Sequence, residues 1–279
     1  MKILVSDLDG TFLEKNGSPP TNSSEFIKFF HKKGFIIIFA TARPIGNLKS
    51  NILKKNLKPD WVICNDGAIA ISFIEDEPTI AIENNLSDLL VKENSSLFRN
   101  FGLKPLFFTG SKHSFKVYIP SSTCLEEEQH IKLSDPTRDI IRYDDMNEII
   151  RIGSIRSVSL YGNIKDKTAR SVMTANKNKA NIMYYKETRF DGKMWLDIIS
   201  MNADKSKVSL SLAKTVGRFQ IDIALGNGLN DLSLINNAVW SSCPNSAIKE
   251  IKKIVSFISS EDEGKLFLND VINQMETHL

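Results

Sequence analysis

Cysteine is scarce in this chain of 279 residues, and its three copies, Cys64, Cys124 and Cys243, are far apart. No CxxC pair occurs, so the sequence gives no sign of a cysteine-held zinc site or of a disulfide framework. Free thiols are typical of a reducing compartment, which favours the cytoplasm. The histidines also lack the spacing of a metal site and are interpreted as ordinary surface residues; they are His31, His113, His130 and His278.

Long apolar runs and a strong net charge are absent as well. One of the longest apolar runs, FIIIFA at 35–40, has the length of a strand, so no membrane-spanning segment is expected. The chain opens on MKILVSD, which has the character of a strand and leaves no room for a secretory signal. The net charge is only +3, and the basic residues between 165 and 179 have no interleaved aromatic residues. A nucleic-acid partner is therefore not expected.

What the sequence has is an alternation of strand and helix patterns. A run of apolar residues without alternation is typical of a parallel strand that is covered on both faces. The first part of the chain predicts a strand at 3–6, a helix at 23–34, a strand at 35–43, a helix at 44–58 and, within 60–71, a strand that runs into an Asn-Asp-Gly turn. This order indicates an α/β fold, in which a Rossmann-like parallel sheet is wound with helices.

The alternation changes after the third strand. From about residue 72 to 190, short strands and helices are mixed, and the first pattern resumes at WLDIIS, residues 195–200. We therefore predict a core domain formed by residues 1–77 and 193–279. Residues 78–192 are predicted to form a second, α+β domain inserted into the core.

Two acids follow the first strand directly, in ILVSDLDGTFL at residues 3–13. Asp7 and Asp9 are separated by one residue, and two carboxylates that close raise each other's pKa unless a cation lies between them. An Asp-Gly turn after a strand is the alternative interpretation. The rest of the chain decides between them, according to whether it supplies a phosphate site and a cation site.

Three further predicted strand or helix ends carry groups of that kind. They are Thr41–Arg43, Lys205 with the loop before it, and Gly226–Asp231. In a parallel sheet, ligands bind at the carboxyl ends of the strands, so these groups are expected to meet Asp7 and Asp9 there. A carboxylate such as Asp7 can attack phosphorus, and a second one can move the proton. A lysine stabilises the charge of the phosphoryl group, and Mg²⁺ offsets its repulsion by carboxylates.

DLDGTFL, FATARP, Lys205 in NADKSKVSL, and GNGLND resemble, in order and spacing, the four motifs of the haloacid dehalogenase (HAD) superfamily. The resemblance is closest to its Cof-type and sucrose-phosphatase-like phosphatases. These have a C2 cap, an α+β domain inserted between the third core strand and the lysine motif. ICNDGA at 63–68 is similar to the stretch that precedes this cap. The resemblance covers the core, whereas in the cap it depends on size and position alone.

The resemblance implies a role for each matching residue. Asp7 would be the nucleophile and Asp9 the general acid and base, and both would contact Mg²⁺. The other metal contacts would come from Asn227 and Asp231. The residues that would bind the phosphoryl group are Thr41, Ala42, Arg43, Lys205 and Asn230.

One position departs from the family pattern. The fourth motif usually has GD, whose aspartate binds magnesium, whereas this chain has Asn227. An amide oxygen can bind a hard cation but brings no negative charge. Either Asp231 holds the metal in compensation, or metal binding is weakened, or the protein binds phosphates without turning them over.

The expected function is that of a cytoplasmic, Mg²⁺-dependent phosphatase acting on a small phosphorylated metabolite. A sugar phosphate is favoured, since relatives with a C2 cap mostly act on these. A phosphomutase of the same fold and a non-catalytic phosphate-binding protein remain as alternatives. The sequence leaves open the substrate, the cap residues that select it, and whether the protein is a monomer or a homodimer.

Overall fold

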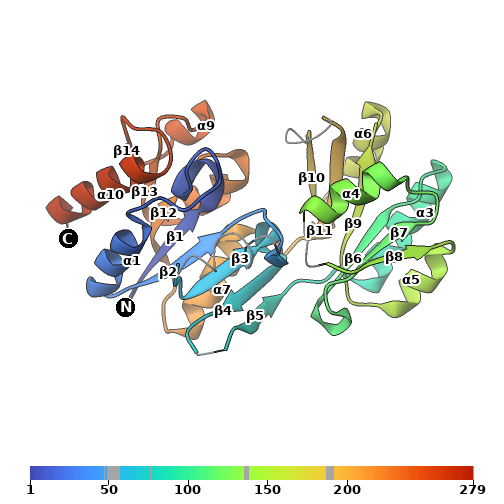
Figure 1. Cartoon of the computed structure of the whole chain (residues 1–279), viewed down its shortest axis with the longest axis horizontal. Helices are drawn as coiled ribbons and strands as arrows, with labels where there is room; N and C mark the ends of the chain where they lie inside the picture. Colours follow the sequence, from blue (N-terminus) through green and yellow to red (C-terminus); the bar gives the residue numbers. More distant parts are fainter. Residues whose placement is uncertain (47, 49–56, 76, 135–137, 187–191, 279) are drawn as a thin grey trace. The chain divides into compact units, whose positions relative to one another are not determined.

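The computed structural model describes residues 1–278 except 47, 49–56, 76, 135–137 and 187–191. The chain divides into two compact units (Figure 1). The core unit comprises Met1–Ile82 and Asp204–Leu279, and the inserted unit comprises Glu83–Ala203. The inserted unit thus interrupts the core unit in sequence.

The core unit contains an eight-stranded sheet. Its strands, in spatial order, are β14 (Phe257–Ile258), β13 (Ala238–Cys243), β12 (Ile221–Leu225), β1 (Lys2–Asp7), β2 (Phe35–Ala40), β3 (Trp61–Cys64), β4 (Ile69–Ser72) and β5 (Thr79–Glu83). The pairs from β14 to β3 are parallel, and β4 is antiparallel to β3. The chain leaves β1 toward β2 and later returns on the other side of β1 as β12. This reversal of strand order is where ligands bind in doubly wound sheets.

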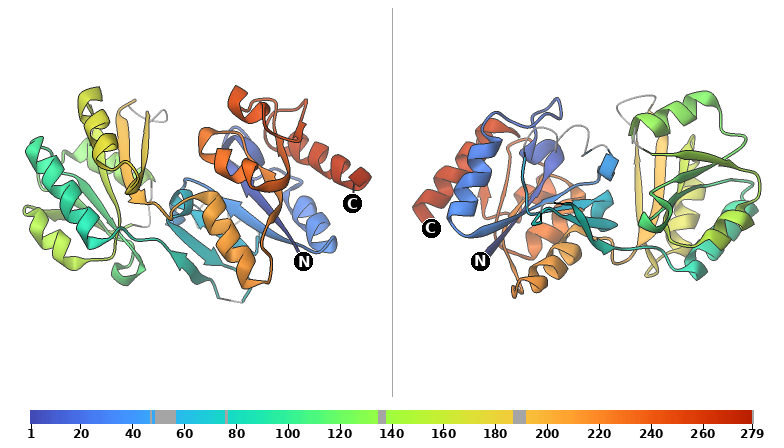
Figure 2. Two further views of the ribbon diagram at one scale, coloured as in Figure 1. Left: turned by 180° about the vertical axis from the view of Figure 1, so that it is seen from behind. Right: turned by 60° about the horizontal axis from the view of Figure 1, so that its bottom comes forward.

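Helices cover both faces of this sheet, which explains its continuous apolar strands (Figure 2). Alternate residues of β1 and β2, such as Val5 and Ile38, pack in one cluster with Val208 and Leu234. On the opposite face, Phe39 contacts Phe12 with 4.6 Å between the ring centroids. The α-helices that the structure describes in the core unit are α1 (Ser23–Lys32), α7 (Lys205–Thr215), α8 (Leu232–Asn236), α9 (Lys249–Lys252) and α10 (Lys265–His278).

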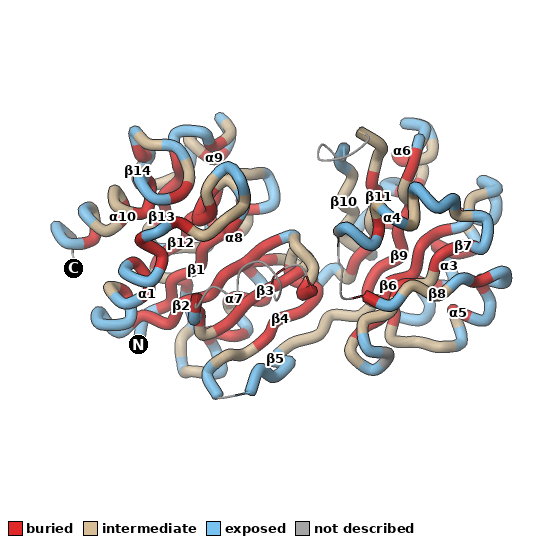
Figure 3. The backbone as a smooth tube through the Cα atoms, viewed as in Figure 1, coloured by how far each residue is buried: buried red, intermediate tan, exposed pale blue. Residues whose placement is uncertain are grey.

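The inserted unit has its own six-stranded sheet and its own core, shown as buried strands in Figure 3. Its order is β10 (Ala180–Lys186), β11 (Met194–Ser200), β9 (Ile155–Gly162), β6 (Leu106–Thr109), β7 (Val117–Pro120) and β8 (Ile140–Tyr143). Among the described strand pairs of this sheet, β7 and β8 are parallel and the others are antiparallel. One face packs against α3 (Asp88–Asn100), α5 (Met146–Ile152) and α6 (Asp166–Ala175), and the other against α4 (Leu125–Ser134).

This architecture confirms the predicted α/β fold with an inserted α+β domain, but three details differ. Residues 193–203, which we assigned to the core, belong to the inserted unit, because β11 pairs with β9 and β10. Residues 78–82, which we assigned to the insertion, belong to the core unit. Within 60–71, the strand and the Asn-Asp-Gly turn that we predicted are β3 and residues 65–67, but the chain continues after the turn as a second, antiparallel strand, β4. The predicted helix at 44–58 lies mostly outside the described residues.

The cause of the first error is the environment of β11. Its Trp195, Leu196, Ile198 and Ile199 are all buried, since side chains of both faces of the inserted sheet are covered. An apolar run of this kind indicates a strand covered on both faces but does not identify its sheet. None of the helices in the described ranges is both long and apolar enough to cross a membrane.

Candidate active site

The sequence-predicted site residues of the core unit come together at the carboxyl end of β1 and its neighbours. Asp7 is the last residue of β1, Thr41 follows β2 directly, and Lys205 is the first residue of α7. Residues 226–231 follow β12, which pairs with β1. Parallel strands end at the same edge of a sheet, which explains how positions up to 224 residues apart in sequence meet.

Lys205 is the centre of this group. Its Nζ donates to Asp7 Oδ1 at 2.6 Å and to Asp231 Oδ1 at 2.8 Å. The exposed fractions of the three side chains are 1% for Lys205, 7% for Asp7 and 0% for Asp231. Two carboxyl groups and one ammonium are therefore buried together, and their net charge is −1 when both carboxyl groups are ionised. A buried charge without a partner is unfavourable. A cation bound next to these carboxyl groups would balance their excess negative charge.

The pKa of Asp7 is raised to about 7, because burial and the neighbouring Asp231, which raise it, outweigh Lys205, which lowers it. Burial lowers the pKa of Lys205, but Asp231, Asp7 and Asp66 outweigh this effect and hold it above its ordinary value. Lys205 thus remains positively charged. Asp7 is a carboxyl group that a nearby cation would convert fully to the ionised, nucleophilic form.

Asp231 is engaged on both of its carboxylate oxygens. Oδ1 accepts from Lys205, and Oδ2 accepts from the backbone N–H groups of Asn227 at 2.9 Å and Gly228 at 3.1 Å. The carboxylate thus closes the turn after β12 and holds Lys205. We expected Asp231 to contact the metal, and in this structure both of its oxygens accept hydrogen bonds from protein groups.

Asp9 forms a bidentate ion pair with Arg43. Arg43 Nε donates to Asp9 Oδ2 at 2.7 Å, and Nη2 donates to Oδ1 at 2.5 Å. The backbone N–H of Arg43 donates to Thr41 Oγ1 at 3.1 Å, which fixes the arginine on the loop after β2. We expected Arg43 to bind the phosphoryl group, whereas here it orients Asp9. Ala42 lies between Thr41 and Arg43 in sequence and is exposed.

Asn227 lies directly against the loop after β1. A Cβ atom added to Gly10 would lie 2.2 Å from Asn227 Nδ2 and 3.6 Å from Oδ1. Gly10 also has a φ of +73°, which favours glycine. Glycine at this position therefore allows the Asn227 amide to approach the backbone between Asp9 and Thr11.

Asp66 is a site residue that the sequence analysis missed. It belongs to the short turn η3 (Asn65–Gly67) after β3, where it has a φ of +51° and accepts from Asn230 Nδ2 at 2.9 Å. Burial raises the pKa of Asp66, whereas Lys205 and the Asn230 hydrogen bond lower it. Asn230, expected to bind phosphate, thus contacts an acid. An acid in a turn at the same sheet edge as Asp7 was the available signal.

Gly67 explains how this turn approaches Lys205. A Cβ atom at Gly67 would lie 2.4 Å from the backbone nitrogen of Asp204, the residue that caps α7. The φ of Gly67 is +104°, so a side chain here would be strained as well as obstructed. Close contact of the turn with the start of α7 places Asp66 near the Lys205 ammonium.

The side-chain oxygens of Asp7 and Asn227 suit a hard cation such as Mg²⁺ as ligands. Within the described residues, no three Asp, Glu, His or Cys side chains converge as a metal site. Among the described residues, no hydrogen-bond donor contacts Asp7 Oδ2, and the Asn227 side chain, which lies against Gly10, carries an amide oxygen. Mg²⁺ is commonly bound by one or two carboxylates, with phosphate oxygens and water completing its shell. The residues present therefore fit this ion.

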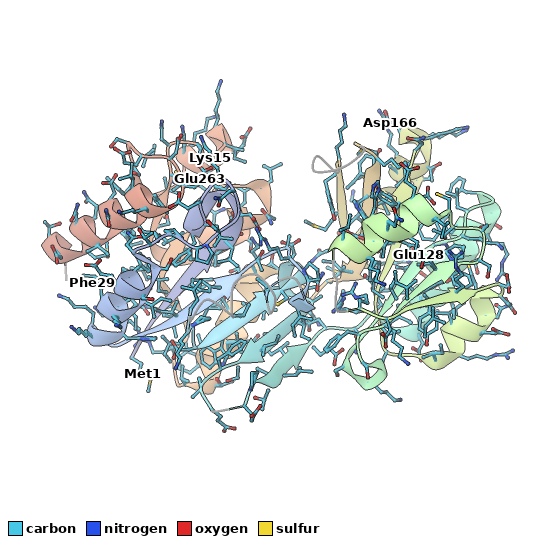
Figure 4. All side chains as sticks on the ribbon, in the orientation of Figure 1. Met1, Lys15, Phe29, Glu128, Asp166 and Glu263 are labelled. Carbon is cyan, nitrogen blue, oxygen red and sulfur yellow. The ribbon has the colours of Figure 1, made fainter. Side chains whose placement is uncertain are left out.

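A second loop borders the β1 loop at the same end of the sheet. The Gly264 N–H donates to the Thr11 carbonyl at 3.0 Å, and Lys15 pairs with Asp262 at 3.3 Å. Lys15 and Glu263, labelled in Figure 4, mark these two loops. The last segment of the chain thus supports the loop that carries Asp9 and Gly10.

The chain is similar in sequence and in fold to known proteins. The model of the family described as haloacid dehalogenase-like hydrolases matches residues 4–264. The Mycoplasma genitalium protein named "Putative phosphatase MG265" is 24% identical over 283 residues, covering 95% of this chain and 94% of that protein.

Solved structures share the fold over nearly the whole length. TM0651 from Thermotoga maritima has a TM-score of 0.77 and 16% identity, covering 98% of this chain and 97% of its own. BT4131, described as a HAD subclass IIB sugar phosphatase, has a TM-score of 0.72 and 18% identity, covering 100% of this chain and 99% of its own. At these identities the likeness concerns the fold alone.

Proposed function

Because the chain belongs to the family of haloacid dehalogenase-like hydrolases, we propose that it is a Mg²⁺-dependent phosphatase that releases inorganic phosphate from a small phosphorylated metabolite. The observation that carries the proposal is the buried Lys205, whose ammonium is 2.6 Å from Asp7 at the end of β1. A carboxylate next to a fixed positive charge is suited to attack phosphorus, since the charge attracts the phosphoryl oxygens.

Asp7 acts as the nucleophile in the proposed reaction. One oxygen of Asp7 forms a bond to phosphorus, and the bond from phosphorus to the substrate oxygen breaks. The carboxyl group of Asp9 gives its proton to the leaving oxygen. Asp9 then takes a proton from water, whose oxygen attacks phosphorus, so that phosphate leaves and the Asp7 carboxylate is restored.

The protein groups around Asp7 have separate roles in this proposal. Lys205 holds the transferring group and Asp231 keeps Lys205 in place, while Asp7, Asn227 and the Asp9 carbonyl would hold Mg²⁺. The ion supplies positive charge that offsets repulsion between Asp7 and the phosphate. We also propose the reducing cytoplasm as its location, which suits the free thiols of Cys64, Cys124 and Cys243.

A sugar phosphate is the substrate class that we propose. The support is the sugar phosphatase BT4131, whose fold is shared along the whole chain. The test is a panel of phosphorylated metabolites, including hexose and pentose phosphates, with release of inorganic phosphate measured in Mg²⁺ and in EDTA. Release that needs a bisphosphate activator would indicate a phosphomutase, and no release from any compound would indicate a binding protein.

Arg43 gives a prediction about Asp9. Arg43 occupies both carboxylate oxygens of Asp9, and one of these two hydrogen bonds must open before Asp9 carries a proton to the leaving oxygen. We expect Arg43→Ala to lower kcat about 10²-fold, within the range for general acid–base catalysis, with KM nearly unchanged. Steady-state kinetics on the best substrate of the panel would measure both constants.

Two comparisons separate orientation of Asp9 from binding of phosphate. If Arg43 acts through Asp9, the double variant Arg43→Ala/Asp9→Asn is little slower than Asp9→Asn alone, because the two residues form one unit. Lys15→Ala, which removes an exposed positive charge from a neighbouring loop, serves as the control. A large rise in KM with unchanged kcat would instead make Arg43 a phosphate ligand.

A further inference from the structure

The acidic side chains at the candidate site are nearly all occupied by protein donors. Both oxygens of Asp9 accept from Arg43, and both oxygens of Asp231 accept from Lys205 and backbone amides. Asp66 Oδ1 accepts from Asn230. Moving any of these carboxylates toward a metal ion would break hydrogen bonds to protein groups. Moving Asp231 would also take a buried partner away from Lys205.

The protein therefore offers a divalent cation very little negative charge. Asp7 brings one carboxylate, which it already shares with Lys205 at 2.6 Å. Asn227, fixed against Gly10, brings an amide oxygen and no charge. Because Mg²⁺ dehydrates reluctantly, one shared carboxylate and neutral oxygens make a weak site for it.

A phosphate faces the complementary difficulty at the same place. Lys205 is its nearby positive charge, but Asp7 and Asp231, when both are ionised, outweigh that charge and leave the buried group at −1. A phosphate dianion alone would be repelled, and a cation alone would lack ligands. Together they supply what each lacks, since phosphate oxygens commonly complete the shell of Mg²⁺.

We infer that Mg²⁺ and the phosphoryl group bind to this protein jointly, each strengthening the binding of the other, as a consequence of Asn227. The inference rests on the metal and phosphate site of the proposed function and adds how that site is filled. Such coupling is reciprocal, so the factor by which phosphate tightens Mg²⁺ binding equals the factor by which Mg²⁺ tightens phosphate binding.

Calorimetric titration of the full-length protein with Mg²⁺, in the absence and presence of inorganic phosphate, measures this factor directly. A titration of Mg²⁺ into phosphate without protein is subtracted. We expect phosphate to lower the dissociation constant of Mg²⁺ at least about tenfold, within the span of about 5–150-fold that is typical of coupled sites. The reverse titration, with phosphate added to the Mg²⁺-loaded protein, must give the same factor.

Asn227→Asp tests the cause. The added carboxylate is expected to tighten Mg²⁺ binding without phosphate at least about tenfold and to reduce the coupling factor, as a charged ligand replaces a neutral one. Asn236→Asp is the matched control, because Asn236 is exposed on α8 and the substitution adds the same charge. It should change neither value.

Each outcome bears on a different claim. Equal Mg²⁺ affinity with and without phosphate, or no Mg²⁺ binding in either titration, would overturn the inference. So would an Asn227→Asp variant that binds Mg²⁺ no more tightly than the unaltered protein. Coupled binding together with no phosphate release from any substrate would keep the inference and reject the phosphatase. Metal-dependent release without coupling would do the reverse.

Discussion

Asp7→Asn is expected to reduce turnover at least about 10³-fold, equivalent to about 4 kcal/mol of lost transition-state stabilisation. The physical reason is that an amide cannot replace the carboxylate as nucleophile at the end of β1. Phosphate release from the best substrate of the panel, in saturating Mg²⁺, is the measurement. Asp88→Asn, which makes the same change at an exposed position on α3, should leave turnover unaltered.

The fold of Asp7→Asn can be checked by its thermal stability in EDTA. The pKa of Asp7 in the folded protein is about 7, above its ordinary value of 3.8, because burial opposes ionisation. Stability contributed by the protonated group is present below the ordinary pKa and is lost as pH rises through about 7. The metal-free variant should therefore unfold at a higher temperature than the unaltered protein at about pH 8, with a smaller difference near pH 5.

Activity and stability together decide the role of Asp7. Retention of more than a few per cent of turnover would reject attack by Asp7 on phosphorus. A variant that is inactive but less stable at about pH 8 would show that the loss comes from damaged packing. Inactivity with equal or higher stability is the result that supports a nucleophile.

The edge of the sheet at which the site lies could be predicted because it depends on local sequence. Continuous apolar runs define β1 and β2, and the polar residues that follow them, Asp7 and Thr41, must lie where those strands end. The ordering of motifs then brings Lys205 to the same edge, where it contacts Asp7. These steps need only strand periodicity and the geometry of a parallel sheet.

What could not be predicted are the partners of each side chain. From the sequence, Arg43 could bind either a phosphate or Asp9. It pairs with Asp9 because the loop after β2 brings it next to the loop after β1, which the sequence does not reveal. Asn230 meets Asp66 across 164 positions in the sequence. The turn amides that occupy Asp231 are nearby in sequence, and a carboxylate three or four residues after them was a signal for a closed turn.

Lys205→Met is the second substitution with a large expected effect, and it acts on stability as well as turnover. The substitution keeps most of the buried volume but leaves Asp7 and Asp231 as neighbouring carboxylates without their ammonium. Removing one partner of a buried ion pair lowers the free energy of unfolding by about 3–5 kcal/mol. Urea unfolding of the metal-free protein at about pH 8 would measure the loss, and turnover should fall at least about 10²-fold, as for loss of one charge-stabilising donor.

The double variant Lys205→Met/Asp231→Asn tests whether stranded charge causes that loss. Asparagine retains an oxygen that can accept from the Asn227 and Gly228 amides, while the negative charge next to Asp7 disappears. We expect the double variant to be more stable than Lys205→Met in urea, although Asp231→Asn alone should destabilise the protein by loosening Lys205. Opposite signs for one substitution in two backgrounds would demonstrate direct coupling. Equal effects of Asp231→Asn in both backgrounds would mean that Lys205 contributes to stability through its packing and that the buried charges are balanced in another way.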